Sequence, residues 1–253
     1  MDAAVHSASE AQGGKPLSCL RVGTEEGYQR WARTYDQDPN PLLAREERHI
    51  LPLLPSLAGK RVLDLACGTG RWLEKLAARG ALQAVGVDYS AAMLQVADSK
   101  PALTGRLARA DCLKLPFHAS VFDLAICSFA LTHVPDLNGI ACELAAILKP
   151  NSDVFVTDLH SDAYTQGWRT SFRDEHGSVE IETAPHTAEE ITQCFQNEGF
   201  EHRTIDELYL EEPERPVFSR ARKEHLFGLA SQVPAILFFH FRRGFPEARQ
   251  ECR

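Results

Sequence analysis

Two aspartates that flank a glycine-rich turn are the residues with the clearest chemical potential. Asp64 lies in a short apolar run, and the turn that follows it contains Gly68 and Gly70. Glycines there let the backbone turn tightly and approach a ligand closely. Asp88 ends the next apolar run, about 20 residues further on, where an acidic side chain can bind both hydroxyls of a ribose. The pattern predicts a nucleoside-binding site.

A dinucleotide is the first alternative ligand for such a turn. The dinucleotide fingerprint needs a third small residue three positions after the second glycine. Leu73 occupies that position and Trp72 precedes it, so the bulky pair would obstruct close packing over a pyrophosphate. Asp64 has no counterpart in the dinucleotide pattern, and its carboxylate suits a ligand that carries an ammonium group.

The elements that position these residues alternate between strand and helix. Short apolar runs predict strands at 61–65, 84–88, 107–110, 122–127, 152–158, 201–210 and 234–243. Helical patterns lie at 25–35, 42–54, 71–79, 91–98, 137–148, 187–197 and 219–233, with Ser90 and Thr187 as expected N-caps. This order predicts an α/β fold with a mainly parallel sheet, whose ligands bind at the carboxyl ends of the strands.

Length and composition indicate one globular domain. The 253 residues include 44% hydrophobic and 25% charged residues, with a net charge of -8. That charge opposes nonspecific binding of nucleic acid. We find no apolar run of the roughly 18 residues that span a membrane and no signal-peptide core. The seven cysteines are scattered and form no CxxC metal motif. We therefore expect reduced thiols in a cytoplasmic protein. We also expect neither nucleic acid nor a membrane as a partner.

Several ordered motifs then match one family together. The segments DLACGTG, GVDYSAAML, ADCLKLPF, FDLAICSFALTHVPD and LKPNSDVFVTD resemble the Rossmann-like methyltransferases that use S-adenosyl-L-methionine (SAM). The resemblance covers roughly residues 25–200 and is strongest to the small-molecule branch that includes ubiquinone- and menaquinone-biosynthesis enzymes. It implies a seven-stranded sheet with helices on both faces, SAM as cofactor and S-adenosyl-L-homocysteine as product.

The domain boundaries follow from the same comparison. We expect a flexible tail at 1–22 and one methyltransferase domain at 23–253. Within it, 23–58 would form a helical lid over SAM. The helical insertion 211–233 before the last strand could cover the pocket, form a dimer contact or lie as a peripheral helix on the sheet. Both a monomer and a homodimer fit the sequence.

The resemblance also implies a set of cofactor-binding residues. Asp64 and the turn would hold the methionine end of SAM, Asp88 the ribose and Asp111 the adenine amino group. The full set is Tyr28, Tyr35, Asp64, Ala66, Cys67, Gly68, Gly70, Asp88, Tyr89, Met93, Asp111, Cys112, Leu113, Cys127 and Ser128. Each aspartate also has a structural interpretation as a turn or helix-cap residue, Met93 as core, and the cysteines as small packed side chains.

The class of acceptor is narrowed by what the sequence lacks. Cys127-Ser128-Phe129-Ala130 after the fourth strand is neither the Asn/Asp-Pro-Pro-Tyr/Phe motif of amino-methylating nucleic-acid enzymes nor the Pro-Cys of cytosine-carbon enzymes. Asp158 alone is insufficient for a magnesium site of the catechol type. A small molecule methylated without a metal is the remaining interpretation.

Candidate acceptor residues lie in the loops after the strands and in the lid. His133 and His160 follow the fourth and fifth strands, where an imidazole could act as a general base. The predicted substrate residues are Trp31, His133, His160, Trp168, Arg169 and Phe172. Structural alternatives are core packing for the lid aromatics, a structural role for His133, a surface position for Arg169 and local structure for His186.

Two other functions fit the same fold. The chain could use SAM for a cyclisation or rearrangement, or it could be a non-catalytic module that binds SAM. Methyl transfer consumes SAM in proportion to product, and the other two do not.

Overall fold

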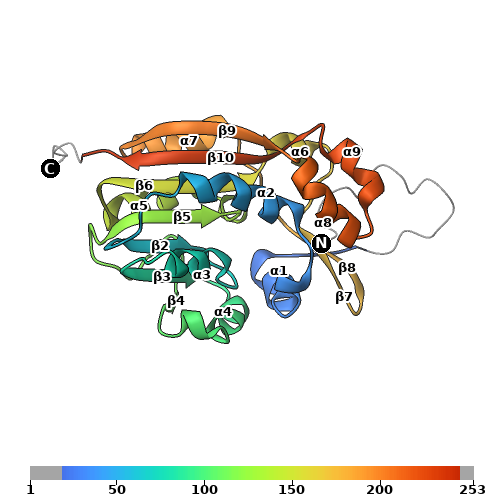
Figure 1. Cartoon of the computed structure of the whole chain (residues 1–253), viewed down its shortest axis with the longest axis horizontal. Coiled ribbons are helices and arrows are strands. Elements are labelled where there is room, and N and C mark those ends of the chain that lie inside the picture. Colours follow the sequence, from blue (N-terminus) through green and yellow to red (C-terminus); the bar gives the residue numbers. More distant parts are fainter. Residues whose placement is uncertain (1–18, 246–253) are drawn as a thin grey trace.

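A seven-stranded sheet forms the centre of the computed structural model, which describes residues 19–245 (Figure 1). The strand order is β4-β3-β2-β5-β6-β10-β9. The strands are β2 (Arg61–Leu65), β3 (Gln83–Asp88), β4 (Leu107–Arg109), β5 (Phe122–Ser128), β6 (Leu148–Leu159), β9 (Phe200–Tyr209) and β10 (Pro234–Arg243). The first five strands in this order pair in parallel, and β10 pairs antiparallel with both β6 and β9. The predicted mainly parallel α/β fold is confirmed.

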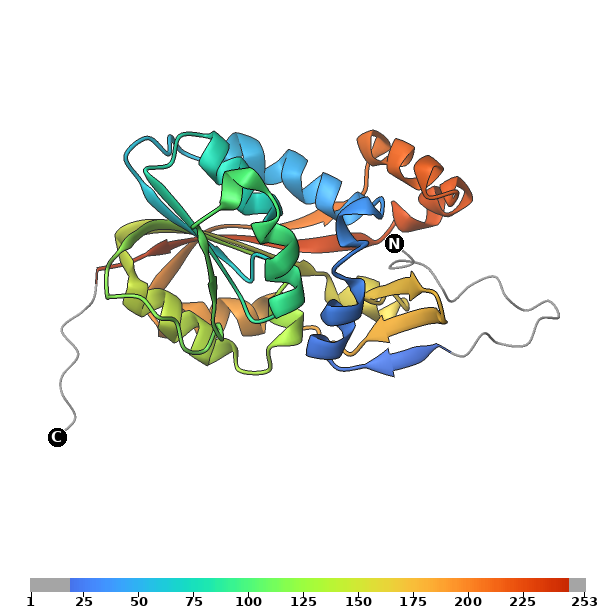
Figure 2. The same ribbon diagram turned by 90° about the horizontal axis from the view of Figure 1, so that it is seen from below.

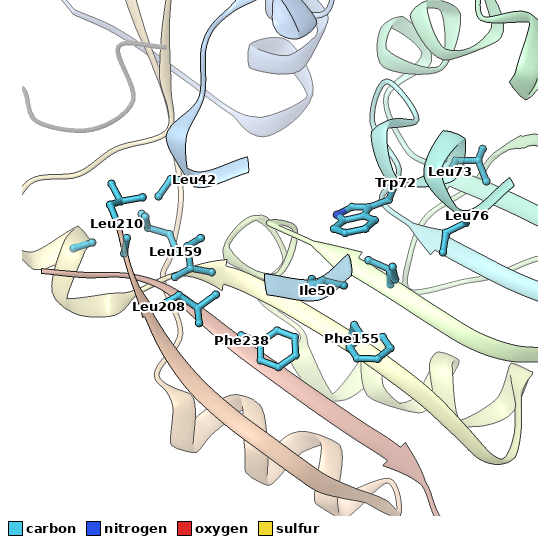
Figure 3. Close-up of a cluster of buried hydrophobic side chains, with 14 of the residues drawn as sticks. Leu42, Ile50, Trp72, Leu73, Leu76, Phe155, Leu159, Leu208, Leu210 and Phe238 are labelled. Atoms are coloured by element: carbon cyan, nitrogen blue, oxygen red, sulfur yellow. The ribbon is translucent and has the colours of Figure 1, made fainter. Parts of the chain in front are cut away.

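Helices cover both faces of this sheet (Figure 2). They are α2 (Pro41–Ile50), α3 (Arg71–Ala78), α4 (Ala91–Asp98), α5 (Leu137–Ile147) and α7 (Ala188–Asn197). Successive strand side chains point to opposite faces. Accordingly Val62 packs in the cluster with α2 and α3, whereas Leu63 and Leu65 pack in the cluster with α5 and α7. Figure 3 shows the first cluster, in which Trp72 and Ile50 lie over the sheet.

The predicted helix starts are confirmed by their caps. The Ser90 side chain accepts a hydrogen bond from the Met93 amide, 3.4 Å away. Thr187 and Glu190 form a reciprocal capping box at the start of α7. Each cap satisfies amides that the first turn of a helix leaves without partners.

A second, three-stranded sheet was missed in the sequence. It has the order β1-β8-β7, from β1 (Leu20–Val22), β7 (Ser171–Asp174) and β8 (Gly177–Ile181). The tail predicted at 1–22 is therefore wrong for 20–22, and its residues 1–18 lie outside the described part. Strands of three to five residues carry too little alternation for their periodicity to be recognised.

Helix α1 (Thr24–Trp31) packs on this small sheet and is shorter than predicted. Trp31 stacks on Phe172 of β7 with ring centroids 5.0 Å apart, and Tyr35 begins a separate 3₁₀ turn. The short helix α6 (Ser161–Thr165) connects β6 to this region. The N-terminal segment and the segment after β6 thus form one packed unit beside the main sheet.

The insertion before β10 contains two short helices instead of the one predicted at 219–233. These are α8 (Arg215–Arg220) and α9 (Phe227–Ala230). Arg222 between them has a φ of +57°, a left-handed conformation that interrupts a right-handed helix. Phe218 and Phe227 join the core cluster that contains Ile50 of α2, as expected for a peripheral element.

No helix among residues 19–245 is long and apolar enough to cross a membrane.

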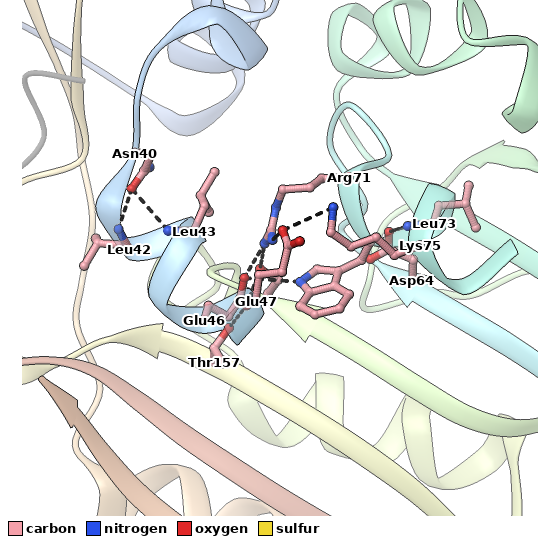
Figure 4. Close-up of polar contacts among 12 residues, drawn as sticks. Asn40, Leu42, Leu43, Glu46, Glu47, Asp64, Arg71, Leu73, Lys75 and Thr157 are labelled. Carbon is pink, nitrogen blue, oxygen red and sulfur yellow. Dashed lines mark hydrogen bonds and ion pairs between the residues drawn. The ribbon is translucent and has the colours of Figure 1, made fainter. Parts of the chain in front are cut away.

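Glu46 of α2 joins several elements at the carboxyl end of the sheet (Figure 4). Its side chain is fully buried and accepts hydrogen bonds from Trp72 Nε1 at 3.2 Å and Ser128 Oγ at 2.7 Å. It also accepts from Thr157 and pairs with Arg71. One carboxylate therefore connects α2, α3, β5 and β6.

We predict that Glu46→Ala lowers the free energy of unfolding by about 3 kcal/mol or more, because removing one partner leaves buried polar groups without compensation. Glu47→Ala is the matched control. Glu47 is partly exposed and pairs with Lys75 at 3.1 Å, so we expect a loss below about 1 kcal/mol. Urea denaturation of both variants measures the difference, and equal losses would contradict the role of Glu46.

Candidate functional site

A cavity of about 400 Å³ lies at the carboxyl ends of the central strands. Strands β2 and β5 are neighbours there although β3 and β4 separate them in the sequence, so the strand order reverses at this point. Ligands of open α/β sheets bind at such a reversal. The cavity walls come from the loops after β2, β3, β4 and β5 and from the N-terminal segment.

The glycine-rich turn presents its backbone to this cavity. Ala66, Gly68 and Gly70 have φ values of +56°, +54° and +83°. A Cβ at Gly70 would lie 2.3 Å from the Leu103 side chain, whereas a Cβ at Gly68 would have no atom within 4 Å. A side chain at position 70 would therefore clash with Leu103, so packing requires glycine there. A side chain at position 68 would meet no protein atom, so the space beside Gly68 is open.

Asp64 supports the turn from behind and does not line the cavity. It is 1% exposed and accepts a hydrogen bond from the Leu73 amide at 2.8 Å. Burial raises the pKa of this carboxyl to about 7. Cys67 and Gly70 also lie outside the cavity lining. Geometrically, these three residues shape the turn that faces the ligand.

Asp88 lies at the cavity and is tied to the same turn. Its Oδ2 accepts from the Gly68 amide at 2.8 Å and its Oδ1 from the Ser90 amide at 2.7 Å. Burial raises the pKa of Asp88 above its usual value. Each oxygen keeps a further lone pair for a ligand hydroxyl. Asp88 thus holds the turns after β2 and β3 and is also a candidate ribose ligand.

Aromatic and acidic groups line the side of the cavity near β4. The Tyr89 ring is 54% exposed, and the Arg109 guanidinium lies 5.5 Å from its centroid. Met93 is buried beneath the cavity wall, and Asp111 accepts a hydrogen bond from the Leu113 amide at 2.9 Å. A flat ring beside a carboxylate suits a nucleobase with an amino group.

Most of the predicted cofactor residues line this one cavity: Tyr28, Tyr35, Ala66, Gly68, Asp88, Tyr89, Met93, Asp111, Cys112, Leu113, Cys127 and Ser128. Burial raises the pKa of the Cys127 thiol well above its usual value, which fits a packed, unreactive thiol. Phe129 also lines the cavity and was not predicted, although it directly follows β5; its φ is +51°. Thr24 and Glu25 line it as well, and no sequence signal for them is evident.

His133 lies where the first cavity meets a second, smaller one. Its Nε2 is 2.8 Å from the Tyr28 hydroxyl, and burial lowers the pKa of the imidazole to about 4. The second cavity has a volume of about 50 Å³. Tyr28, Tyr35, Phe129 and His133 line both cavities, so these residues form the boundary between them.

The smaller cavity contains three of the predicted substrate residues, Trp31, His133 and Arg169, and a carboxyl group that was not assigned to the site. Asp158 at the end of β6 is 3% exposed and accepts hydrogen bonds from the amides of Thr132, at 2.5 Å, and Leu159, at 2.7 Å. Burial raises its pKa to about 7. From the sequence, Asp158 was considered only as a ligand of a magnesium site.

His160 lines neither cavity, which argues against the predicted general base. Strand β6 extends to Leu159, and the His160 amide donates to the Ala235 carbonyl of β10. The imidazole caps α6 through the Asp162 amide at 3.0 Å and lies 3.4 Å from Glu207 of β9.

Trp168 and Phe172 also lie outside both cavities and are buried in the core, at 3% and 1% exposure. Their predicted substrate contacts therefore gain no support from the geometry. Among residues 19–245, no group of three or more His, Cys, Asp or Glu side chains could hold a metal ion.

The comparisons with known proteins fit this geometry. Residues 62–151 match the family described as "Methyltransferase domain". These residues resemble that family in sequence. The matched segment contains the glycine-rich turn, Asp88, Asp111 and the strands β2 to β5. The resemblance to Rossmann-like SAM-dependent methyltransferases is therefore confirmed.

Two curated relatives are similar to part of this chain. A 2-phytyl-1,4-naphtoquinone methyltransferase of Synechococcus elongatus is 37% identical over 111 residues, which cover 40% of this chain and 47% of the relative. A demethylmenaquinone methyltransferase of Tropheryma whipplei is 32% identical over 139 residues, which cover 52% of this chain and 56% of the relative. The chain thus spans about half the length of the curated relatives it matches.

A solved structure extends the likeness in fold. The S-adenosylmethionine-dependent methyltransferase of Mesorhizobium loti superposes with a TM-score of 0.62 at 21% identity. The match covers 81% of this chain and 100% of the other. At this identity, the superposition supports the fold alone.

We predict that Asp64 makes the protein less stable as pH rises from about 4 to about 7. Its folded pKa is about 7 against an ordinary 3.8, so the folded state binds the proton more tightly than the unfolded state in this window. As the pH rises through this window, the free energy of unfolding of Asp64→Asn should therefore increase relative to that of the wild type by up to about 4 kcal/mol. Denaturation at several pH values measures it. Asp98→Asn, at an exposed site of α4, is the control, and parallel curves for wild type and Asp64→Asn would contradict the prediction.

Proposed function

We propose that this chain transfers a methyl group from SAM to a small-molecule acceptor and releases S-adenosyl-L-homocysteine. The observation that carries the proposal is the cavity at the reversal of strand order, where Asp88 is hydrogen-bonded to the open glycine turn. The methyltransferase-domain match over the same strands supports it. We propose that the transfer needs no metal.

The lining residues suggest how SAM is held. Asp88 binds the ribose hydroxyls, while Tyr89 and Met93 flank the adenine. Asp111 accepts a hydrogen bond from the adenine amino group. The turn from Ala66 to Gly70, which Asp64 supports, holds the methionine end, and Ser128 lies on the cavity floor.

Methyl transfer is an in-line displacement in which the acceptor lone pair forms the new bond to carbon. The carbon–sulfur bond breaks and its electron pair stays on sulfur. The protein contributes alignment of the reacting atoms and exclusion of water. Tyr28 and Tyr35 cover the boundary between the cavities. His133 at this boundary is neutral at pH 7 and has a nitrogen that can accept a proton.

The relatives' names support a small-molecule acceptor, because both are quinone-type methyltransferases by name. We propose that the chain acts in the cytoplasm and without nucleic acid, which the net charge of -8 disfavours as a partner.

The experiment that tests the proposal follows the methyl group itself. Purified protein is incubated with SAM labelled in its methyl group and with fractionated cell extract. Label in a small-molecule product, with an equal amount of S-adenosyl-L-homocysteine, supports methyl transfer. SAM that binds and stays unconsumed while a product forms would favour a cyclisation or rearrangement, and binding without any product would favour a non-catalytic module.

We predict that Asp88→Ala weakens SAM binding by about tenfold to a few hundredfold. A carboxylate contributes about 1.5–3 kcal/mol through each hydrogen bond to a ligand. Isothermal titration calorimetry measures the change. Asp98→Ala is the matched control, because Asp98 is exposed at the end of α4 and lies outside the cavity. Unchanged affinity in a folded Asp88→Ala protein would remove Asp88 from the site.

A further inference from the structure

The smaller cavity contains a buried carboxyl group without a cationic partner. Asp158 is 3% exposed, and its two oxygens accept hydrogen bonds only from the Thr132 and Leu159 amides. No Lys, Arg or His side chain among residues 19–245 forms an ion pair with it, and no charged neighbour contributes to its raised pKa. An unpaired buried carboxylate is costly unless a ligand compensates it.

Aromatic rings surround the same cavity. Tyr28, Trp31, Tyr35 and Phe129 all line it. The Trp31 ring lies 4.8 Å from Tyr35 in an edge contact and 6.1 Å from Tyr28 in a stacked contact. Ring faces attract cations electrostatically, and several rings together form the cages that bind ammonium groups.

The other charged group at the cavity is directed elsewhere. Arg169 lies 3.8 Å over the Tyr164 ring and donates hydrogen bonds to the carbonyl oxygens of Tyr164 and Trp168, each at 2.7 Å. Its Nε is 3.9 Å from Glu180. His133 is neutral, because burial lowers its pKa to about 4. Neither group therefore neutralises Asp158.

We propose that the acceptor is a small protonated amine, bound between Asp158 and the aromatic rings and methylated on nitrogen. This inference rests on the proposed function and adds the class of acceptor. The carboxylate provides the opposite charge and a hydrogen-bond acceptor. The rings of Trp31 and Tyr35 provide polarisable faces that a neutral hydroxyl would use less well. The shared wall of Tyr28, Tyr35, Phe129 and His133 brings the amine beside the SAM cavity.

The reaction balances without a further reagent. The ammonium group gives one proton to the Asp158 carboxylate and becomes a neutral amine with a free lone pair. That lone pair attacks the SAM methyl carbon as the carbon–sulfur bond breaks, with its electrons left on sulfur. The products are a methylated ammonium ion, S-adenosyl-L-homocysteine and one proton, which leaves Asp158 for solvent.

A matched pair of probes tests the charge preference on the unaltered protein. Propylammonium and propanol have similar shape and differ in charge. Each is titrated at pH 7 into protein saturated with S-adenosyl-L-homocysteine, and binding is followed by saturation-transfer NMR. We expect propylammonium to bind at least about tenfold more tightly. Equal affinity, or tighter binding of propanol, would overturn the proposal.

A variant then assigns the preference to Asp158. Asp158→Asn removes the charge and should reduce the ratio of the two affinities to near one, while calorimetric affinity for SAM stays within about twofold. Asp162→Asn is the control, since Asp162 is an exposed aspartate on the same side of the sheet and lines neither cavity. A ratio unchanged in Asp158→Asn would overturn the assignment. Should that variant unfold, the probe ratio of the wild type decides alone.

Different results would contradict the proposed function and the proposed acceptor class. Absence of SAM binding in the wild type contradicts the proposed function. SAM binding with methyl transfer to a neutral hydroxyl, and no preference for propylammonium, leaves the methyltransferase function intact and removes only the amine.

Discussion

The buried carboxylate of Glu46 is the interaction on which the arrangement of the site depends. It accepts hydrogen bonds from Trp72 and Ser128 and bonds with Arg71 and Thr157. An isolated carboxylate in this environment would be costly, so its burial requires all these donors to be in position together. The elements α2, α3, β5 and β6 are thereby held in one arrangement at the edge of the sheet where both cavities lie.

This anchor connects the cofactor site with the elements that cover it. Ser128 lines the larger cavity and donates to Glu46, while Leu42 and Leu43 at the start of α2 line the smaller one. The turn after β2 has a second support in Asp64, which holds the first turn of α3. Two buried acids thus fix the backbone whose exposed side faces the larger cavity, and Asp88 and Asp111, the proposed ligand residues, line that cavity.

The sequence predicts well those features that depend on local pattern. Apolar runs gave the seven main strands, and the side chains of Ser90 and Thr187 gave the starts of their helices, because caps and periodicity act within a few residues. The family motifs gave most residues of the larger cavity. The small sheet was missed since its strands are very short and since β1 pairs with β8 across more than 150 residues. His160 was misjudged because one further residue of β6 directs it towards β9 and β10.

The role proposed for Asp158 could not be predicted from the sequence for a related reason. Its significance comes from two observations: no cation among residues 19–245, Arg169 of the same cavity included, forms an ion pair with it, and four rings from α1, the following 3₁₀ turn and the residue after β5 line that cavity. Such a combination is a property of the tertiary structure, and single-residue patterns do not carry it.

The small sheet has a consequence for how acceptor preference can diversify. Its strands come from the segment before α1 and from the segment after β6, and Trp31 is packed on Phe172 of the edge strand β7. This unit contributes Trp31, Arg169 and Thr170 to the smaller cavity, and the start of α2 contributes Asn40, Leu42 and Leu43. The glycine turn, Asp88 and Asp111 lie at the carboxyl ends of strands of the main sheet. Replacement of this one module would change much of the proposed acceptor pocket and, through Tyr28 and Tyr35, one wall of the larger cavity. The glycine turn, Asp88 and Asp111 would stay unchanged, which makes the module a natural target for redesigning acceptor choice.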